Sequence, residues 1–441
     1  KCTPPTTRID SSPMYSWVWL SLLAALVVVS LGLYYPLFGG SALEGILATR
    51  PLVRLANAMW GRSTRKKMEA EGVPRPTATI EYSPGLEMDV YDGRDAPTSP
   101  APCILYFHAG AFLVGDKAFG AGTLGWMVAR GAVGISVGYA LTSGKDGRGL
   151  GGCIDSANAA LRYVRSNAAS LGIDPAQVVV WGDSAGGLLS LALGTGLATP
   201  RAVASVDRPM LVVAGWPCCT VESRWYAPRR LPEGGWAETP SRGEMDPPCA
   251  FVPEGKGGTA AAAQRQLQRV LAGTFLLFGP RGGGWLPASV PAHWPQDDGA
   301  SLSPLSRASE AGLPPTLLLV GGADGTTPAG QALLFAERAR AAGRAVGALV
   351  FEGADHGTGG VNCAAGRSAV LRFLKQHGLR GVDLEADSVG ESHVEAATRV
   401  FGTGGVEYSS APLEGKDGQW LVEGRATVSL PPAAPADKKM I

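Results

Sequence analysis

From about residue 78, short apolar runs alternate with stretches whose apolar residues recur every three or four positions. Runs of the first kind are typical of buried strands, and stretches of the second kind are typical of helices with one buried face. Strands that alternate with helices form a parallel sheet covered on both sides, so an α/β domain is predicted. The predicted strands are 101–107, 132–141, 178–181, 210–214, 316–320 and 346–351, and the predicted helices are 153–169, 188–197, 328–342 and 368–377.

Two regions break this alternation. Residues 217–304 are rich in Pro, Gly, Trp and Arg, and a structureless loop of that length is uncommon in a compact domain. We interpret them as an insertion that covers or borders a site, with partial disorder as the alternative. After about residue 380 the alternation stops, so the domain is predicted to span 78–380 and to be followed by a short-stranded or disordered tail over 381–441.

The N-terminal part carries a different signal. After a short segment over 1–16, residues 17–38 contain no charged side chain. A helix of this length would span about 33 Å at about 1.5 Å per residue, enough to cross a bilayer. A cleaved signal peptide is the alternative, but its apolar region is shorter and needs a small-residue cleavage site. We therefore expect a transmembrane helix; the aromatic residues near its ends are Trp17, Trp19, Tyr34 and Tyr35.

Residues 39–77 are predicted to form a basic linker. Within it, residues 41–70 mix apolar and basic side chains, which suits either a helix on the membrane surface or a solvated linker helix. We expect a single-pass membrane protein of the endoplasmic reticulum or another endomembrane. Basic residues on both sides of the apolar segment leave the side of the α/β domain undecided.

Composition narrows the functional classes. Hydrophobic residues make up 45% of the 441 positions and charged residues 17%, as in a folded chain, and the net charge of +1 gives no general attraction to nucleic acid. The seven cysteines lack the C-x-x-C spacing of metal sites and form no evident disulfide framework, although a bridge from Cys218 or Cys219 to Cys249 stays open. No metal or organic cofactor is implied.

The strongest chemical motif is Gly182-Asp183-Ser184-Ala185-Gly186-Gly187, which matches G-x-S-x-G. It stands between a predicted strand and a predicted helix, the context in which this motif presents a nucleophilic serine on a sharp turn. Small residues two positions to either side let the chain turn without collision. The start of the following helix favours developing negative charge near the serine.

An acid and a base that could serve this serine follow in the chain order that the motif requires. Asp324 ends the predicted strand 316–320 after two glycines, and His356 follows the strand 346–351. The carboxyl ends of parallel strands meet at one edge of a sheet, so Ser184, Asp324 and His356 should converge there. Less suitable alternatives are Asp355, which adjoins the histidine, Asp297 or Asp298 in the insertion, and His293, His377 and His393, which lack a strand-end context.

Over about residues 78–378 the chain resembles α/β-hydrolases of the hormone-sensitive-lipase and carboxylesterase type. The resemblance rests on the serine motif, on His108-Ala109-Gly110-Ala111-Phe112 after a strand, and on the strand ends at Asp324 and His356. It implies an oxyanion hole made by the backbone N–H groups of Ala109, Gly110 and Ala185, with His108 in a structural role. Ala109 and Ala111 depart from the glycines that are usual in this family.

These features together predict an α/β-hydrolase fold with a mostly parallel, doubly covered sheet, and a membrane-anchored serine hydrolase that cleaves carboxylic esters of small molecules or lipids. Ser184 would form an acyl-enzyme, His356 would take its proton, and Asp324 would orient the imidazole. Two alternatives stay open. One is an inactive binding module that retains a relic site, and the other is an amidase or acyltransferase that uses the same three residues.

Overall fold

The computed structural model describes the compact unit that begins at Asn57. The predicted transmembrane helix over 17–38 and most of the insertion lie outside the described residues. Within the part of the chain that is described, no helix combines the length and apolar character that a membrane crossing requires. The described ranges are 57–95, 99–112, 114–141, 149–197, 207–222, 227–238, 301–385, 389–401, 408–410 and 423–428.

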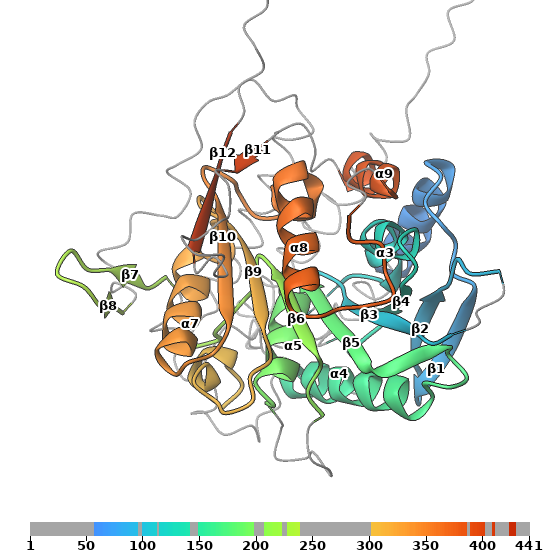
Figure 1. Cartoon of the computed structure of the whole chain (residues 1–441), viewed down its shortest axis with the longest axis horizontal. Coiled ribbons are helices and arrows are strands. Elements are labelled where there is room, and N and C mark those ends of the chain that lie inside the picture. The colour runs from blue at the N-terminus through green and yellow to red at the C-terminus, as the bar shows by residue number, and fades with distance from the viewer. Residues whose placement is uncertain are drawn as a thin grey trace, which may run out of the picture. The chain divides into compact units, whose positions relative to one another are not determined.

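The described strands build a ten-stranded sheet in the order β1-β2-β4-β3-β5-β6-β9-β10-β12-β11 (Figure 1). The strands from β4 to β12 in this order are parallel, and the antiparallel strands β1, β2 and β11 lie at the two edges. Their bounds are β1 Ala78–Ser83, β2 Leu86–Tyr91, β3 Ala101–Phe107, β4 Val133–Val137, β5 Ile173–Asp183, β6 Leu211–Gly215, β9 Thr316–Gly321, β10 Val346–Phe351, β11 Tyr408–Ser410 and β12 Glu423–Val428.

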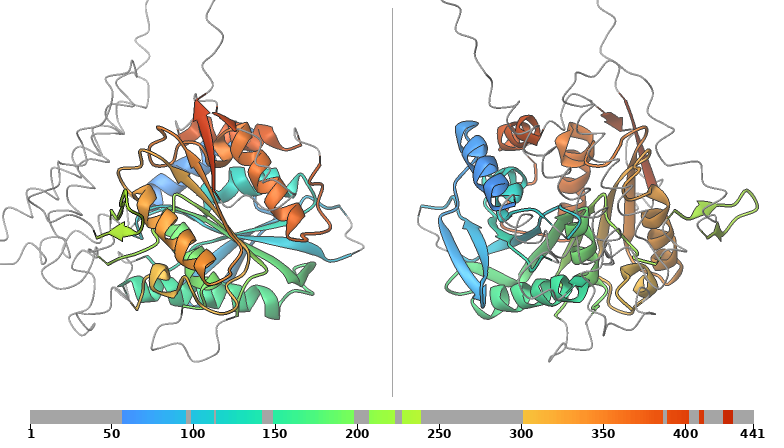
Figure 2. Two further views of the ribbon diagram at one scale, coloured as in Figure 1. Left: turned by 60° about the vertical axis from the view of Figure 1, so that its left-hand side comes forward. Right: turned by 180° about the vertical axis from the view of Figure 1, so that it is seen from behind.

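Helices cover both faces of the sheet (Figures 1 and 2). On one face, Leu105 of β3 belongs to the same buried cluster as Ile154, Leu188 and Phe335 of α4, α5 and α7. On the other face, its neighbour Ile104 packs in a second cluster with residues of α3, α8 and α9. The mostly parallel, doubly covered sheet predicted from the sequence is therefore confirmed. The helix bounds are α3 Ala121–Val128, α4 Gly149–Ser166, α5 Ala185–Gly194, α7 Ala329–Ala341, α8 Ala364–Gln376 and α9 Glu391–Phe401.

The predicted elements differ from the observed ones mainly at their ends. Strands β3 and β10 have the predicted bounds, whereas β5 begins at Ile173, before the expected residue 178. Helix α5 begins at Ala185, directly after the serine, and not at residue 188. The small residues that open α5 carry no apolar periodicity, so the pattern alone placed its start too late.

The sheet continues past residue 380, where the sequence pattern placed the end of the domain. Strand β12 pairs in parallel with β10, and α9 packs against α3 closely enough that a Cβ on Gly122 would lie 2.3 Å from the Cβ of Ala397. Val394 and Ala396 of α9 are buried. The expected short-stranded or disordered tail therefore includes a packed helix and a strand of the main sheet. Their partners are far away in sequence, so no local alternation marks them.

The prediction of a linker up to residue 77 also needs correction. Residues 57–70 are helical, and the buried Met68 places this helix in the same cluster as α3 and α9. The Nη2 atom of Arg65 lies 2.9 Å from Oδ2 of Asp89, a fully buried residue of β2. This helix, which we call the N-terminal helix, is thus part of the α/β unit. Residues 39–56 lie outside the described part.

The two described ends of the insertion lie side by side. The backbone N–H of Val221 donates to Oγ of Ser303 at 2.9 Å, which joins the first residues of the insertion to its last residues. Between them, β7 (Arg229–Arg230) and β8 (Trp236–Ala237) form a small hairpin. Arg230 reaches Glu337 of α7 at 2.9 Å, so the hairpin is tied to the α7 side of the unit. Among the cysteines, Cys218 and Cys219 are buried free thiols, and Cys249 lies outside the described residues.

A substitution in α9 tests whether the C-terminal residues belong to the folded unit. Val394→Ala should lower the free energy of unfolding by about 1–3 kcal/mol, because it removes buried methyl groups from the hydrophobic cluster that α9 shares with α3. Glu395→Ala, at the exposed neighbouring position, should change it by less than about 0.5 kcal/mol. Urea unfolding of both variants makes the comparison. Equal stabilities would mean that α9 does not contribute to the fold.

Candidate active site

Ser184 occupies a strained turn between β5 and α5. Its backbone has φ 56° and ψ −114°, a conformation that residues with a side chain rarely adopt and that costs about 1–3 kcal/mol. A Cβ on Gly182 would lie 2.2 Å from the carbonyl oxygen of Gly186, and one on Gly186 would lie 1.9 Å from that of Phe107. Both glycines of the motif are therefore required by close backbone contacts. The Ser184 N–H donates to the Gly215 carbonyl at 2.7 Å and holds the turn against β6.

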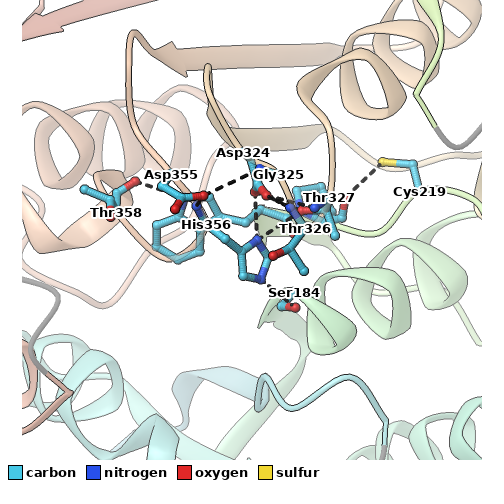
Figure 3. Close-up of polar contacts among 11 residues, drawn as sticks. Ser184, Cys219, Asp324, Gly325, Thr326, Thr327, Asp355, His356 and Thr358 are labelled. Carbon is cyan, nitrogen blue, oxygen red and sulfur yellow. Dashed lines mark hydrogen bonds and ion pairs between the residues drawn. The ribbon is translucent and has the colours of Figure 1, made fainter. Parts of the chain in front are cut away.

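The structure brings the three predicted residues together at the carboxyl edge of the sheet. Ser184 Oγ lies 2.9 Å from Nε2 of His356, and Nδ1 of His356 lies 2.7 Å from Oδ2 of Asp324. Figure 3 shows the imidazole between the serine hydroxyl and the carboxylate. An ionised carboxylate only accepts, so Nδ1 carries the ring proton and Nε2 is left to accept the serine hydroxyl. This arrangement suits a nucleophile, a base and an orienting acid.

Two further residues that the sequence analysis did not identify fix the acid. The backbone N–H groups of Thr326 and Thr327 each donate to Oδ1 of Asp324 at 2.8 Å. The Thr327 hydroxyl lies 2.9 Å from Oδ2 of the same carboxylate. With both oxygens engaged, the carboxylate has one orientation in which Oδ2 also meets His356. The sequence signal was a Thr three residues after an Asp, a spacing at which a side chain can bond to nearby backbone.

Trp216 joins the loops that carry the acid and the base. It follows β6 with a strained φ of 43°, and its carbonyl lies 2.9 Å from the Thr327 hydroxyl. Its indole Nε1 donates to the carbonyl of Thr358, just after His356, at 3.0 Å. Sequence reasoning gave no sign of this role, because both partners lie more than a hundred residues away. The tryptophan thus sets the distance between the two loops.

The electrostatics of His356 favour its use as a base near neutral pH. Burial by itself would lower its pKa, but the adjacent Asp324 carboxylate and the hydrogen bond to it outweigh burial and raise the pKa above the ordinary value. Asp355 makes a smaller contribution in the same direction. Its carboxylate accepts the His356 backbone N–H at 2.7 Å, so it holds the backbone of the loop while Asp324 contacts the imidazole.

The three residues predicted to form the oxyanion hole lie on neighbouring segments. Ala185 is the first residue of α5, and Ala109 and Gly110 lie in the loop after β3, just beyond His108. The contact of Gly186 with the carbonyl of Phe107 brings the start of α5 against the end of β3. Backbone N–H groups from these two segments could therefore face an oxyanion bound at Ser184.

The alanines in this loop are accommodated in different ways. Gly110 has φ 140°, and a Cβ there would lie 1.9 Å from the carbonyl oxygen of Val114, so only glycine fits. Ala111 adopts φ 51°, a left-handed conformation that glycine adopts freely and alanine at a cost of about 1–2 kcal/mol. Ala109 has no such positive φ. Alanine at positions 109 and 111 is thus compatible with the course of the loop after β3.

His108 has a structural environment. It is buried and stacked on Tyr139 with ring centroids 4.3 Å apart, and burial lowers its pKa to about 4. Its Nδ1 lies 2.8 Å from the Ala109 carbonyl, to which a neutral imidazole can donate. His377 is the C-cap residue of α8 and His393 lies in α9, and neither belongs to the hydrogen-bond chain at Ser184. The alternatives His293, Asp297 and Asp298 lie outside the described residues.

The order of the strands, the serine turn and the placement of the three residues after β5, β9 and β10 identify the architecture. The chain has the α/β-hydrolase fold. A family model described as BD-FAE matches residues 88–206, a stretch that contains the loop after β3 and the serine turn. No curated protein matches the chain in sequence.

Within the described part, no group of three or more His, Cys, Asp or Glu side chains is arranged to hold a metal ion.

Solved structures similar to this chain include a thermophilic esterase, Est2, from the planctomycete Thermogutta terrifontis. The native enzyme is 22% identical, covers 65% of this chain and 84% of its own, and has a TM-score of 0.45. The propionate-bound form is 23% identical, with 65% and 86% coverage and a TM-score of 0.44. The form phosphonylated by sarin is 22% identical, with 65% and 86% coverage and a TM-score of 0.45. At this level of similarity, the fold assignment rests on the sheet and the site.

The raised pKa of His356 predicts the acidic side of the pH profile. The base works only when neutral, so kcat/KM should fall as pH drops through a midpoint above about 6.5, the ordinary histidine value. Asp324→Asn removes the neighbouring charge and should move this midpoint to lower pH while reducing kcat. Asp95→Asn, the same change at an exposed position, should leave the profile unaltered. A midpoint that does not move in Asp324→Asn would disprove the coupling.

Proposed function

We propose that this chain hydrolyses carboxylic esters through an acyl-enzyme on Ser184. The observation that carries the proposal is the continuous hydrogen-bond chain from Ser184 Oγ through His356 to Asp324, with the serine on a strained turn at the start of a helix. Serine is a weak nucleophile unless a base takes its proton, and here the base lies within hydrogen-bond distance. Each of the three groups has the neighbour that its role requires.

The reaction follows from this geometry. His356 Nε2 takes the hydroxyl proton while Ser184 Oγ attacks the ester carbonyl carbon, and the N–H groups of Ala185 and of the loop after β3 stabilise the resulting oxyanion. The tetrahedral intermediate collapses, and the proton on Nε2 passes to the departing alcohol. A water molecule, deprotonated by His356, then attacks the acyl-enzyme. The bond from the acyl carbon to Ser184 Oγ breaks, the proton on Nε2 returns to Oγ, and the acid departs. Asp324 stays ionised throughout and stabilises the imidazolium.

The alternatives differ in how well this site supports them. An amidase or an acyltransferase would use the same first steps and would differ in the leaving group or in the acceptor of the acyl group. An inactive binding module would have no use for the strain at Ser184 or for the aligned imidazole. We therefore favour hydrolysis, with ester as the substrate because an alkoxide leaves more readily than an amide nitrogen.

We propose in addition that the enzyme is a single-pass protein of the endoplasmic reticulum or another endomembrane and acts on lipid or other apolar esters. The uncharged segment over 17–38 supports this, and so does the outer face of the N-terminal helix. Among the described residues, Met59 and Trp60 are the large hydrophobic side chains that are exposed, at 42% and 43%. Beside them, the exposed Arg62, Lys66 and Lys67 suit the headgroups of anionic lipids.

Ester hydrolysis is tested with the full chain in detergent, using p-nitrophenyl acetate, butyrate, octanoate and palmitate. Ser184→Ala should reduce kcat at least about 10³-fold, whereas Ser190→Ala, on the following helix, should retain activity. A fluorophosphonate probe should label the wild type and not Ser184→Ala. Neither turnover nor labelling in folded protein would favour the binding module. Labelling without ester turnover would favour an amidase or acyltransferase, to be assayed with amides and alcohol acceptors.

Membrane attachment is tested by extraction. In cell membranes, the full chain should resist alkaline carbonate, because an apolar helix stays in the bilayer when surface charges are disrupted. A chain that starts at Asn57 should be extracted, yet should still bind phosphatidylserine vesicles at low salt through the N-terminal helix. Trp60→Ser together with Lys66→Glu should weaken that binding, and neutral phosphatidylcholine vesicles serve as the control. Release of the full chain by carbonate would rule out the transmembrane segment.

A further inference from the structure

The N-terminal helix contacts the loop that follows β3, although it lies outside the domain expected from the sequence pattern. The side-chain amide of Asn57 forms two hydrogen bonds with one residue of that loop. Its Nδ2 donates to the Gly115 carbonyl at 3.0 Å, and its Oδ1 accepts the Gly115 N–H at 2.7 Å. The amide thus pairs with both backbone groups of Gly115, much as a neighbouring strand would.

Gly115 in turn presses on the residues that open the same loop. It has φ 116°, and a Cβ there would lie 2.3 Å from Nδ1 of His108 and 2.5 Å from the carbonyl oxygen of Ala109. No larger residue fits this contact. The position of the Gly115 backbone therefore limits where the backbone of Ala109, a predicted oxyanion donor, can lie.

Two further hydrogen bonds hold described residues of this loop, one within the loop and one to Tyr139. Val114 N–H donates to the Gly110 carbonyl at 3.0 Å, which ties the second predicted donor to the residue before Gly115. The Tyr139 hydroxyl donates to the His108 carbonyl at 3.0 Å. Asn57 thus holds the far end of a segment whose near end is held by Tyr139.

The helix that supplies Asn57 is itself firmly placed. Gly61 approaches the Asp116 side chain so closely that a Cβ would lie 2.7 Å from Oδ2, and Arg65 forms an ion pair with the buried Asp89. The Trp60 ring packs edge-on against Phe119, with centroids 4.8 Å apart. These contacts give Asn57 a fixed base from which to hold the loop.

We propose that Asn57 is a positioning residue for the oxyanion hole: its paired hydrogen bonds to Gly115 keep the N–H groups of Ala109 and Gly110 aimed at the oxyanion formed on Ser184. The proposal rests on the esterase function proposed above. It makes the N-terminal helix a necessary part of the active site. Loosening this loop should weaken binding of the transition state more than binding of the substrate.

The test compares the full-length wild type with Asn57→Ala in detergent, using p-nitrophenyl butyrate and a trifluoromethyl ketone, which binds as a tetrahedral oxyanion adduct. Misplaced donors should lower kcat about 10- to 100-fold and change KM less than about 3-fold. The inhibition constant of the ketone should rise by the same factor by which kcat/KM falls. Ala70→Ser, at an exposed position of the same helix, should match the wild type in all three quantities.

A second variant separates positioning from general destabilisation. In Asn57→Asp the carboxylate still accepts the Gly115 N–H but meets the Gly115 carbonyl without a proton, so kcat should fall as in Asn57→Ala. As the pH falls toward the ordinary Asp pKa of about 3.9, protonation restores the missing donor, and the activity relative to the wild type should rise. A purely structural role would give a loss of activity that follows the melting temperature at every pH.

The outcomes distinguish this proposal from the proposed function. An active wild type together with an Asn57→Ala variant that keeps its kcat and its ketone affinity would overturn the role of Asn57 alone. A loss confined to KM, or explained wholly by the unfolded fraction, would do the same. A wild type that neither hydrolyses esters nor reacts with a fluorophosphonate would overturn the proposed function, and the role of Asn57 with it.

Discussion

The close approach of neighbouring backbone segments around Ser184 is the constraint on which the rest of the site depends. The chain turns from β5 into α5 within one residue, and this is possible only because Gly182 and Gly186 leave room for neighbouring carbonyl oxygens at 2.2 and 1.9 Å from where a Cβ would stand. One of those oxygens belongs to Phe107, the last residue of β3. The serine turn therefore fixes the position of the loop that follows β3, which is the segment that would stabilise an oxyanion.

The same edge of the sheet shows how loops from separate strands are held in register. Parallel strands place Asp324 and His356 at one edge of the sheet, but the strands alone do not fix the distance between the two loops that carry these residues. Trp216 supplies that precision by bonding to the loop of the acid through its carbonyl and to the loop of the base through its indole. Side chains that fix a site in this way do not react, yet the alignment of the imidazole depends on them.

A buried carboxylate in β2 performs a comparable task for the N-terminal helix. Asp89 is fully buried in β2 and meets Arg65 at 2.9 Å, Lys117 at 3.3 Å and the Thr79 hydroxyl at 2.6 Å. A charge in such a place needs its partners, and removal of one of them costs about 3–5 kcal/mol. The requirement fastens the N-terminal helix to the edge of the sheet. A helix that the sequence pattern placed in a linker is thereby bound to the loop beside the serine.

The sequence by itself determined the fold class, the serine turn and the two strand ends at Asp324 and His356. The alternation of strands and helices indicates the fold, and each site segment combines a strand, small residues and a reactive side chain within about ten positions. The tertiary structure alone decided that Trp216 and Thr327 align the acid and the base, that Asn57 binds the loop after β3, and that β12 and α9 complete the fold. Asn57 lies 58 positions from Gly115, and Trp216 lies 142 positions from Thr358. Such contacts leave no periodicity in the chain, since they arise only when packed elements bring distant backbone groups within hydrogen-bond distance.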